Sequence, residues 1–564
     1  MGEYFRNRKR NGLDLINMQC FQEKRRKEYI LPVQVVEVEG NVYKPENLLK
    51  GNFMEQNMFD FPDFCEFNGK GYIILDFGRE YFGGVRLFFQ SNGYPSLKPY
   101  LRIRFGESLG ECCSEVGEKN STNDHSTRDM VCYMPMNSDM EWGATGYRFV
   151  RLDFLEEGVF RLNRVYGTYV HSESDPIGSF ECDNTLVNDI FNTAAHTLHL
   201  NMQNCIWDGI KRDQHIWCGD LYPEILGILY LYGNCREIEN TFDYTIRYQQ
   251  KERWINNIPL YNMWFLLCMK EYFSKTGKVK REYLESAKET LCVLKKCIHE
   301  DGSLTFEKGG LFSDNPYYFD WPSHGTPDSV FACYAMTLYT MRQIMGCVYF
   351  GAENIALAKE IEGVLSKKNK EDSGFKAISA MGLLVDKSNR EQALNLIRNN
   401  GASGYSMFMT YFISKALTEN GYVQEAFDNN LQYYGGMLQM GATSFWEGFE
   451  VEWMENACKI TERPQKGQRE VHGDFGKPCY VGYRNSLCHG WSCGVLAFLI
   501  ETVVGFRICD NDCTKFTLKP NLCGLKHISC KIPMAKGIVE IELTQKEDGV
   551  ETNLNIPEGL TRIE

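Results

Sequence analysis

The sequence predicts a multidomain protein of α and β structure, in which a central (α/α)6 barrel lies between an N-terminal β-sandwich and a small C-terminal β-sandwich. Three observations predict this fold class. Residues 28–178 alternate apolar and polar positions with the period of two that is typical of strands, whereas residues 179–505 repeat apolar positions at helical spacing. Residues 506–564 return to the period of two. A chain of 564 residues is also too long for one ordinary domain.

The N-terminal domain is expected to be antiparallel, because its short alternating runs are separated by Gly, Pro and Asn. These runs are YILPVQVVEVEG, GYIILDFG, GGVRLFFQS, LRIRFGES, YRFVRLDFLE and FRLNRVYGTYV. Residues 1–27, which precede them, are interpreted as a polar arm. The insertion from Glu107 to Asp129 is polar and too long for a hairpin loop, and long loops of this kind are often functional. Its Asp124 and His125 could reach the cleft of a neighbouring domain.

The helical pattern begins after Asp183, a predicted N-cap, where apolar residues from Leu186 to Leu198 follow one helical face. Eleven further helical patterns follow, at about 218–233, 237–252, 259–275, 280–298, 327–348, 351–366, 375–384, 388–398, 404–419, 421–434 and 487–504. Twelve helices arranged as hairpins can close into a barrel of six inner and six outer helices. The loops at one end of such a barrel would then form a site.

Composition excludes several classes of protein. A net charge of −13 argues against nucleic-acid binding. The longest apolar stretch, Gly494 to Phe506, is interrupted by Glu501 and is too short to span a membrane. The N-terminal segment lacks the apolar core of a secretory signal, so a cytoplasmic protein is expected.

The 22 cysteines are scattered without a CxxC pair, and several lie in apolar stretches, among them Cys268, Cys333 and Cys493. This pattern favours buried free thiols in a reducing compartment over a disulfide framework. His196 and His199 are three residues apart, but no nearby Cys or His completes a zinc site. The sequence therefore predicts neither a metal nor another cofactor.

Four loops between the predicted helices combine acids or histidine with tryptophan and tyrosine. They are Trp207 to Glu224, Asp314 to Ser323, Gly441 to Glu452, and His472 to Trp491. Burying a charge is costly unless it is paired or hydrogen-bonded, so charges mixed with large aromatic residues indicate a cleft that holds a polar ligand. Sugars offer apolar ring faces and a rim of hydroxyl groups. The competing interpretation is a set of charged connecting loops with incidental tryptophans.

The segments DGIKRDQHIWCGD, GATSFWEGF and SLCHGWSCG resemble the α-L-rhamnosidases of glycoside hydrolase family 78. The resemblance implies an N-terminal β-sandwich, a catalytic (α/α)6 barrel and a C-terminal β-domain. The family carries a motif like D-x-x-x-R-D-E followed by G-W-T-G-D, which Asp208, Arg212 and Asp220 match. Gln214 follows Arg212 and Asp213 where the motif has Glu, and the segment is one residue shorter. Counting back seven positions from Asp220 puts Asp213 in the place of that Glu.

The resemblance implies that Asp213 is the general acid, that Glu447 is the general base, and that His489 contacts substrate. Asp208 and Arg212 would shape the sugar site, and further candidates for substrate binding are Trp217, Asp220, Glu224, Asp320, Trp321, Trp446 and Trp491. Two carboxyl groups on either side of a glycosidic bond are what inversion requires. The alternatives are that Glu447 starts a helix and that His489 is a neutral core residue.

The leading hypothesis is an inverting exo-glycoside hydrolase that releases α-L-rhamnose or a related sugar from oligosaccharides or glycosides. Gln214 and the shortened motif favour an alternative, a sugar-binding relative without catalysis. A polysaccharide lyase or unsaturated-uronide hydrolase on the same barrel is a third hypothesis. A carbohydrate is the expected partner, and a homodimer is compatible with the sequence.

Overall fold

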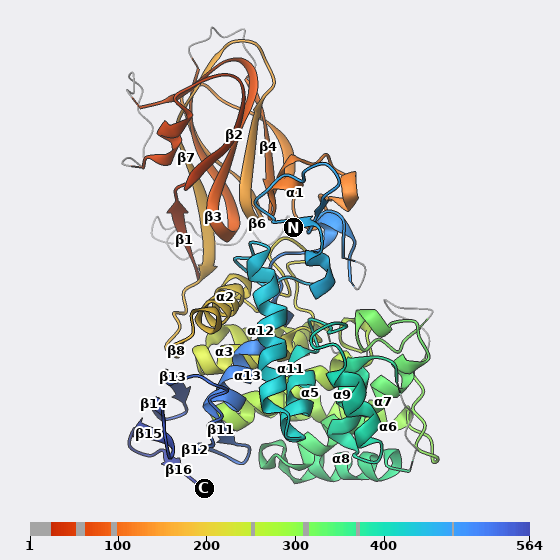
Figure 1. The fold of residues 1–564 in the computed structure, drawn as a ribbon. Helices are drawn as coiled ribbons and strands as arrows, with labels where there is room; N and C mark the ends of the chain where they lie inside the picture. Colours follow the sequence, from red (N-terminus) through yellow and green to blue (C-terminus); the bar gives the residue numbers. More distant parts are fainter. Residues whose placement is uncertain are drawn as a thin grey trace, which may run out of the picture.

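The protein has three parts, which the computed structural model describes over residues 24–51, 63–91, 99–249, 254–307, 315–367, 373–476 and 479–564. Figure 1 shows an N-terminal sheet domain stacked on a large helical domain, with the C-terminal strands beside the helices at the end far from the sheet domain. The predicted fold class is therefore confirmed. Of the predicted polar arm, residues 1–23 lie outside the described residues, as does Asp314 in the second of the four loops.

The N-terminal domain is a seven-stranded antiparallel sheet in the order β1-β7-β3-β6-β4-β5, with β2 paired to β3. β3 pairs with β7 through both of its ends, Cys65–Asn68 and Val85–Ser91, so the sheet folds over an apolar core. GYIILDFG and GGVRLFFQS were expected as two strands, but both belong to the single long strand β3. The strands are β1 (Arg25–Ile30), β2 (Gln34–Tyr43), β3 (Cys65–Ser91), β4 (Tyr100–Gly106), β5 (Asp129–Tyr133), β6 (Ser138–Phe154) and β7 (Val159–Ser172).

The predicted boundary of the polar arm at residue 27 is wrong. Arg25 to Lys27 are the first residues of β1 and pair with Ser172 to Val170 of β7. Their charged side chains hid the strand from a search for alternating apolar residues, because β1 is an edge strand that needs few apolar contacts. The insertion between β4 and β5 contains α1 (Leu109–Cys113), and Ser108 caps it by accepting a hydrogen bond from the Glu111 amide.

The helical domain contains the twelve predicted helices. They are α2 (Thr185–Asn201), α3 (Leu221–Leu231), α4 (Arg236–Tyr244), α5 (Tyr261–Thr276), α6 (Arg281–Lys296), α7 (Asp328–Met345), α8 (Gly351–Leu365), α9 (Lys376–Val385), α10 (Arg390–Arg398), α11 (Thr410–Glu419), α12 (Val423–Gln439) and α13 (Gly494–Phe498). The odd-numbered helices from α3 to α13 each contact the next, and α13 closes on α3. This closed ring is the inner layer of an (α/α)6 barrel.

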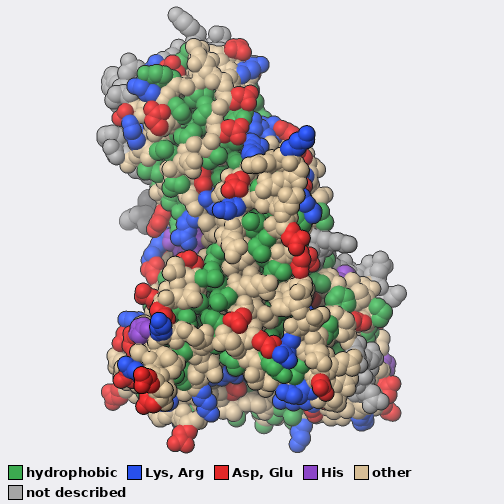
Figure 2. Space-filling view, viewed as in Figure 1, with side chains coloured by type: hydrophobic (Ala, Val, Ile, Leu, Met, Phe, Trp, Pro, Cys, Tyr) green, Lys and Arg blue, Asp and Glu red, His purple; other side chains and the backbone are tan. Residues whose placement is uncertain are grey.

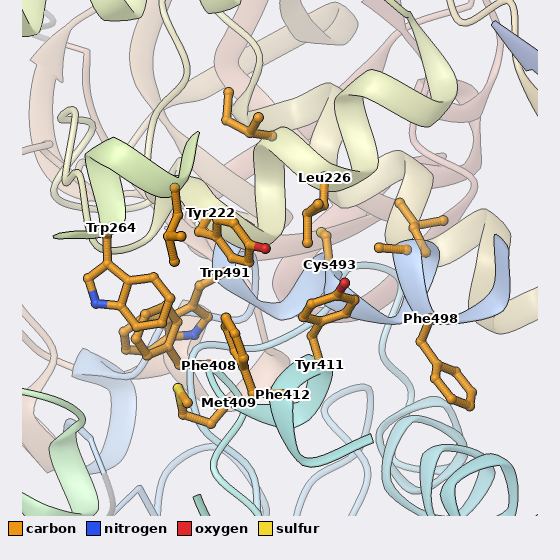
Figure 3. Packing of buried hydrophobic residues seen from close by; sticks show 14 of the residues in the cluster. Tyr222, Leu226, Trp264, Phe408, Met409, Tyr411, Phe412, Trp491, Cys493 and Phe498 are labelled. Atoms are coloured by element: carbon orange, nitrogen blue, oxygen red, sulfur yellow. The ribbon is translucent and has the colours of Figure 1, made fainter. Parts of the chain in front are cut away.

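Burial explains which helices lie inside. Every residue of α3 is buried, whereas α10 buries only Leu394 and Ile397 and exposes a charged face. A helix that is apolar on all sides must be surrounded by protein, and an amphipathic helix can cover the outside. Figure 3 shows the packing within the ring, where the Tyr222 ring of α3 stacks on Phe412 of α11 with centroids 5.4 Å apart.

The C-terminal strands form a three-stranded sheet, β11-β12-β16, and a four-stranded sheet, β15-β14-β13-β8. Strand β8 (Ser179–Cys182) precedes the helices in sequence, yet it pairs with β13, so the boundary predicted at residue 179 misses this strand. Four residues are too few to reveal a period of two. The other strands are β11 (Phe506–Cys509), β12 (Asp512–Leu518), β13 (His527–Met534), β14 (Gly537–Lys546), β15 (Gly549–Asn555) and β16 (Thr561–Arg562).

The start of α2 also differs from expectation. Asn184 is the N-cap, and its side chain accepts a hydrogen bond from the Val187 amide. Asp183, the predicted cap, instead accepts hydrogen bonds from the amides of Lys526 and His527 and so fastens the helix to the C-terminal sheet. Asn and Asp cap helices about equally well, so only the tertiary contact separates the two roles.

The visible face of the molecule is polar and mixed in charge. Figure 2 shows Lys and Arg side chains interspersed with Asp and Glu over both the sheet domain and the helical domain. None of the helices within the described ranges combines the length and the apolar composition needed to span a bilayer.

Candidate active site

The loop between α2 and α3 supplies one wall of a cavity of about 210 Å3, which lies beside the sheet domain because His125 of that domain reaches Asp213 of the cavity wall. Five side chains of this loop line it, and loops from the far side of the ring supply others. The lining residues are Asp208, Arg212, Asp213, Trp217, Asp220, Ile258, Tyr261, Tyr318, Trp321, Glu447, Tyr480, His489 and Trp491. The four loops singled out in the sequence therefore meet at one cavity.

Arg212 bonds to both Asp213 and Glu447, the two carboxyl groups that the family resemblance implies are catalytic. Its Nη2 donates to both oxygens of Glu447 at 2.8 Å, and its Nη1 donates to Oδ1 of Asp213 at 3.0 Å. Nε donates to the Arg484 carbonyl at 3.0 Å, and the Tyr480 ring lies 3.9 Å from the guanidinium carbon. The guanidinium is thus held on several sides, and it fixes Asp213 and Glu447 relative to each other.

Glu447 is buried at 3% side-chain exposure and ionised. Burial alone would raise its pKa, but the charge of Arg212, together with the Ser486 amide at 3.0 Å, lowers the pKa below its ordinary value. The Cys479 thiol is 3.2 Å from Oε1. A buried carboxylate that stays ionised is suited to remove a proton from water.

Asp213 is the most accessible of the four cavity carboxyls, with 15% side-chain exposure against 3% to 6% for Asp208, Asp220 and Glu447. Its Oδ2 accepts a hydrogen bond from the Trp217 indole at 3.0 Å. The His125 imidazole approaches Oδ1 to 3.2 Å. Asp213 therefore lies at the edge of the cavity, where a leaving group would emerge.

Asp208 and Asp220 lie deeper. Burial raises the pKa of Asp208 well above its ordinary value, and the charges of Asp213 and Asp220 raise it further. Burial also raises the pKa of Asp220, and the charge of Glu447 adds to the effect. A raised pKa extends the pH range over which a carboxyl group is protonated, and a protonated carboxyl can donate a hydrogen bond, for example to a sugar hydroxyl.

His489 lies among the acids, with its Nε2 3.7 Å from Asp220, 3.8 Å from Glu447 and 3.9 Å from Asp208. Burial lowers the pKa of its imidazole to about 4, so it is neutral near pH 7. Its ring centroid is 4.4 Å from that of Trp491, whose indole donates to the Glu447 carbonyl at 2.9 Å. His489 is therefore a neutral polar group on the cavity wall.

Three of the residues predicted to bind substrate, Trp446, Asp320 and Glu224, do not line the cavity. Trp446 is 1% exposed and packs edge-on against Phe449. Asp320 is 3% exposed, and burial raises its pKa to about 6. Glu224 lies on α3, one turn beyond Asp220, and burial raises its pKa well above its ordinary value. The sequence placed each of them in one of the four candidate loops, but none of the three is among the residues that line the cavity.

Glu224 also explains a glycine in the segment SLCHGWSCG. A Cβ atom on Gly490 would lie 2.1 Å from the carboxyl carbon of Glu224, which is impossible without rearrangement. Glycine therefore allows the chain after His489 to pass close to α3.

The sequence interpretation missed Ile258, Tyr261, Tyr318 and Tyr480 as lining residues. Tyr318 and Tyr480 stand in two of the four loops, and a rule that counted every aromatic residue there would have found them. Ile258 lies just before α5 and Tyr261 is its first residue, so both stand outside the four loops. Only the closure of the helix ring brings this segment to the cavity.

Gln214 does not replace an acid in the cavity. Its side-chain amide donates to the carbonyls of Ile210, at 2.8 Å, and Ala144, at 3.3 Å, in the loop itself and in the sheet domain. The carboxyl of the preceding Asp213 enters the cavity instead, as counting back from Asp220 predicted.

The insertion from the N-terminal domain reaches the site, as Asp124 and His125 suggested. The Asp124 carboxylate pairs with Arg484 at 2.5 Å, next to the backbone that holds Arg212. Glu107, Glu111 and His472 are close enough together to hold a metal ion, but the ammonium of Lys211 lies among them, 2.8 Å from Glu107 and 3.2 Å from Glu111. The lysine supplies the positive charge there.

Comparisons with known proteins agree with this architecture. Residues 175–264 match the family model of the bacterial alpha-L-rhamnosidase 6 hairpin glycosidase domain. The matched segment covers α2, α3, α4 and the start of α5, at the beginning of the helical domain. The search of curated proteins found no match.

Among solved structures, a GH78 family rhamnosidase of Bacillus sp. GL1 matches with a TM-score of 0.71 and 16% identity, over 92% of this chain and 55% of that one. An alpha-L-rhamnosidase from Dictyoglumus thermophilum matches with a TM-score of 0.68 and 20% identity, over 96% and 59%. A rhamnosidase from Klebsiella oxytoca with rhamnose bound matches with a TM-score of 0.65 and 16% identity, over 85% of this chain and 96% of that one. The chain thus spans 55% to 59% of the first two proteins.

The fold is that of the family 78 α-L-rhamnosidases, and the resemblance inferred from the three sequence segments is confirmed.

Proposed function

We propose that the protein is an inverting exo-glycosidase that releases α-L-rhamnose or a related sugar. The observation that carries the proposal is that Arg212 bonds to both Asp213, at the edge of the cavity, and Glu447, in its depth. Nη1 donates to Asp213 and Nη2 donates to Glu447. The cavity of about 210 Å3 suits one sugar ring and is smaller than pockets for drug-sized ligands. A rhamnosidase of similar fold holds rhamnose, which supports the choice of sugar.

In the proposed mechanism, Glu447 removes a proton from a water molecule as the water oxygen attacks the anomeric carbon. Asp213 transfers its proton to the glycosidic oxygen, and that oxygen keeps the bonding electron pair as it departs. Arg212 keeps Glu447 ionised, and the protonated carboxyls of Asp208 and Asp220 bind sugar hydroxyls. Trp217, Trp321 and Trp491 provide apolar walls for the ring face and the C6 methyl group.

The test is the configuration of the first product. Purified protein is mixed with nitrophenyl α-L-rhamnoside, and proton NMR follows the anomeric signal before mutarotation. Inversion gives β-L-rhamnose first. α-L-Rhamnose as the first product would overturn inversion, and no sugar released from a panel of aryl glycosides and rhamnose-bearing oligosaccharides would overturn the proposal as a whole.

A sugar-binding relative without catalysis remains the second candidate, because one observation favours it. Arg212 and Trp217 donate hydrogen bonds to Asp213, and His125 Nε2 lies 3.2 Å from its Oδ1; such donors stabilise an ionised carboxylate rather than a proton donor. Calorimetry that detects rhamnose binding in the absence of turnover on the same panel would support this candidate.

A further inference from the structure

Three consecutive residues of the N-terminal domain reach the proposed general acid. His125 Nε2 lies 3.2 Å from Oδ1 of Asp213. On one side of it, Asp124 pairs with Arg484 at 2.5 Å, and on the other, the Ser126 hydroxyl donates to the Lys211 carbonyl at 2.5 Å. The imidazole is therefore held at Asp213 by anchors to the helical domain on both sides.

The backbone of the insertion is shaped for this contact. His125 has a φ of 68°, in the left-handed region that non-glycine residues seldom adopt. Such conformations persist where surrounding contacts enforce them, and they are concentrated at functional sites. The contacts of Asp124 with Arg484 and of Ser126 with the Lys211 carbonyl hold the backbone on both sides of His125. The strain and the anchors together direct the imidazole at Asp213.

The donor groups around Asp213 are distributed unevenly over its two oxygens. Arg212 and His125 lie at Oδ1, whereas only the Trp217 indole donates to Oδ2. In a carboxylic acid, the carbonyl oxygen is the better acceptor and the hydroxyl oxygen carries the proton. Two donor groups at Oδ1 thus favour placing the proton on Oδ2, beside the Trp217 wall of the cavity.

We propose that His125, supplied by the N-terminal domain, is a positioning residue that holds the carboxyl of Asp213 and directs its acidic proton to Oδ2. The inference rests on the proposed function, because it takes Asp213 as the general acid. Neutral His125 donates its Nε2 hydrogen to Oδ1 while Oδ2 gives its proton to the departing oxygen. Solvent then returns a proton to Oδ2, and the imidazole is unchanged by the cycle.

The charged and titratable groups near His125 come from three segments. Asp213 and Arg212 lie on the loop before α3, and the His215 ring of that loop meets the His125 ring edge-on at 5.8 Å. Asp124 is its neighbour in the insertion, and Arg484 faces Asp124 from the loop before η10 (Gly490–Cys493). The protonation of His125 therefore depends on these groups as well as on Asp213.

The experiment compares His125→Ala with His125→Gln, whose amide keeps a donor that does not titrate. Wild type and variants are assayed on a rhamnose-containing disaccharide and on nitrophenyl α-L-rhamnoside. We expect His125→Ala to lose about tenfold in kcat/KM on the disaccharide and little on the nitrophenyl glycoside. The loss on the disaccharide should be smaller than the roughly 10²- to 10⁴-fold rate contribution of a general acid, because Asp213 itself is still present. The basic limb of the pH profile of kcat/KM should move to higher pH in this variant, because the His125 donor that favours the ionised carboxyl of Asp213 is gone.

His125→Gln should recover most of the activity and the basic limb. His299→Ala is the matched control, since His299 is exposed and bonds to Thr305 away from the cavity. Wild-type rates in His125→Ala would overturn the proposal. Equal losses on both substrates with an unchanged pH profile would also overturn it, because they indicate a structural role only.

A second measurement does not require activity. The His125 imidazole signal is assigned by its absence from the NMR spectrum of His125→Ala and is compared between wild type and Asp213→Asn at one pH. Because the carboxylate lies 3.2 Å from Nε2, its loss should shift this signal, whereas the signal of His299 should stay in place. An unshifted His125 signal would overturn the contact, whereas a shifted signal in a protein that hydrolyses no glycoside would retain the contact and reject the proposed function.

Discussion

Nη2 of Arg212 bonds to both carboxylate oxygens of Glu447 at 2.8 Å, in a place where both side chains are only 3% exposed. A buried carboxylate without a partner would be protonated, and a buried guanidinium without one would be strongly destabilising. The pair is therefore a single functional unit. Because Nη1 of the same group holds Asp213, the geometry of both proposed catalytic residues depends on Arg212.

Arg212→Met is expected to shift the pH dependence of both activity and stability. In wild type the folded pKa of Glu447 lies below its ordinary 4.5, so the pair stabilises the fold above about pH 4.5 and loses this effect as the pH falls. Without the guanidinium, burial raises the pKa of Glu447. The acid limb of kcat/KM should then move up by one or more pH units.

Kinetics and urea unfolding between pH 4 and 8 measure this effect, and we expect the variant to lose roughly 3 to 5 kcal/mol near neutrality, as is usual when a buried pair is broken. Arg390→Met is the control, because Arg390 is exposed and its guanidinium donates to Asn420. If Arg212→Met kept the acid limb of wild type, the assignment of Glu447 as the base would be wrong.

Asp213→Ala should show a dependence on the leaving group. Nitrophenolate departs readily without a proton, so activity on the nitrophenyl glycoside should be largely retained, while activity on a disaccharide should fall about 10²- to 10⁴-fold. Glu447→Ala should fall on both substrates, and azide should restore part of the activity by giving the β-glycosyl azide. Steady-state rates on the two substrates decide the roles. A leaving-group dependence in Asp220→Ala instead would move the general acid to Asp220.

Glu224→Gln is expected to leave activity nearly unchanged. Burial raises the pKa of Glu224 well above its ordinary value and so favours the neutral acid, which Gln matches in shape. Because the folded pKa exceeds the unfolded one, the free energy of unfolding of wild type decreases as the pH rises above about 4.5, and the variant should lose this decrease. Unfolding at pH 5 and pH 8 measures it.

Glu237→Gln is the matched contrast to that substitution. Glu237 is also buried, but it accepts hydrogen bonds from Ser172, Ser174 and Arg236, and its pKa is lowered. This variant should be destabilised by about 1 to 3 kcal/mol. A large loss of activity in Glu224→Gln without a loss of stability would show that Glu224 takes part in catalysis.

Trp446→Ala and Trp217→Ala should have opposite profiles. Trp446 is packed in the core, so its removal should cost about 3 to 5 kcal/mol of stability. Trp217 lines the cavity and donates to Asp213, so its removal should reduce kcat/KM more than it reduces the unfolding midpoint. Calorimetric unfolding and steady-state kinetics distinguish them. A stable, poorly active Trp446→Ala would return Trp446 to the cavity wall.

The sequence by itself determined the order of the domains and the twelve helices, because period two and period 3.6 are local properties of apolar spacing. It also determined the four loops, since acids beside tryptophan are conspicuous between helices. Counting back from Asp220 also singled out Asp213, which lines the cavity, as the candidate general acid.

Only the tertiary structure decided which side chains of those loops enter the cavity. Trp446 and Trp217 are both tryptophans in loops that carry acids, but Trp446 is packed in the core and Trp217 lines the cavity. The direction in which a loop side chain points depends on how the ring of inner helices closes. That closure involves contacts between residues far apart in the chain. The strand β8, the approach of His125 to Asp213 and the position of Lys211 among Glu107 and Glu111 also arise from contacts between domains, which no local pattern records.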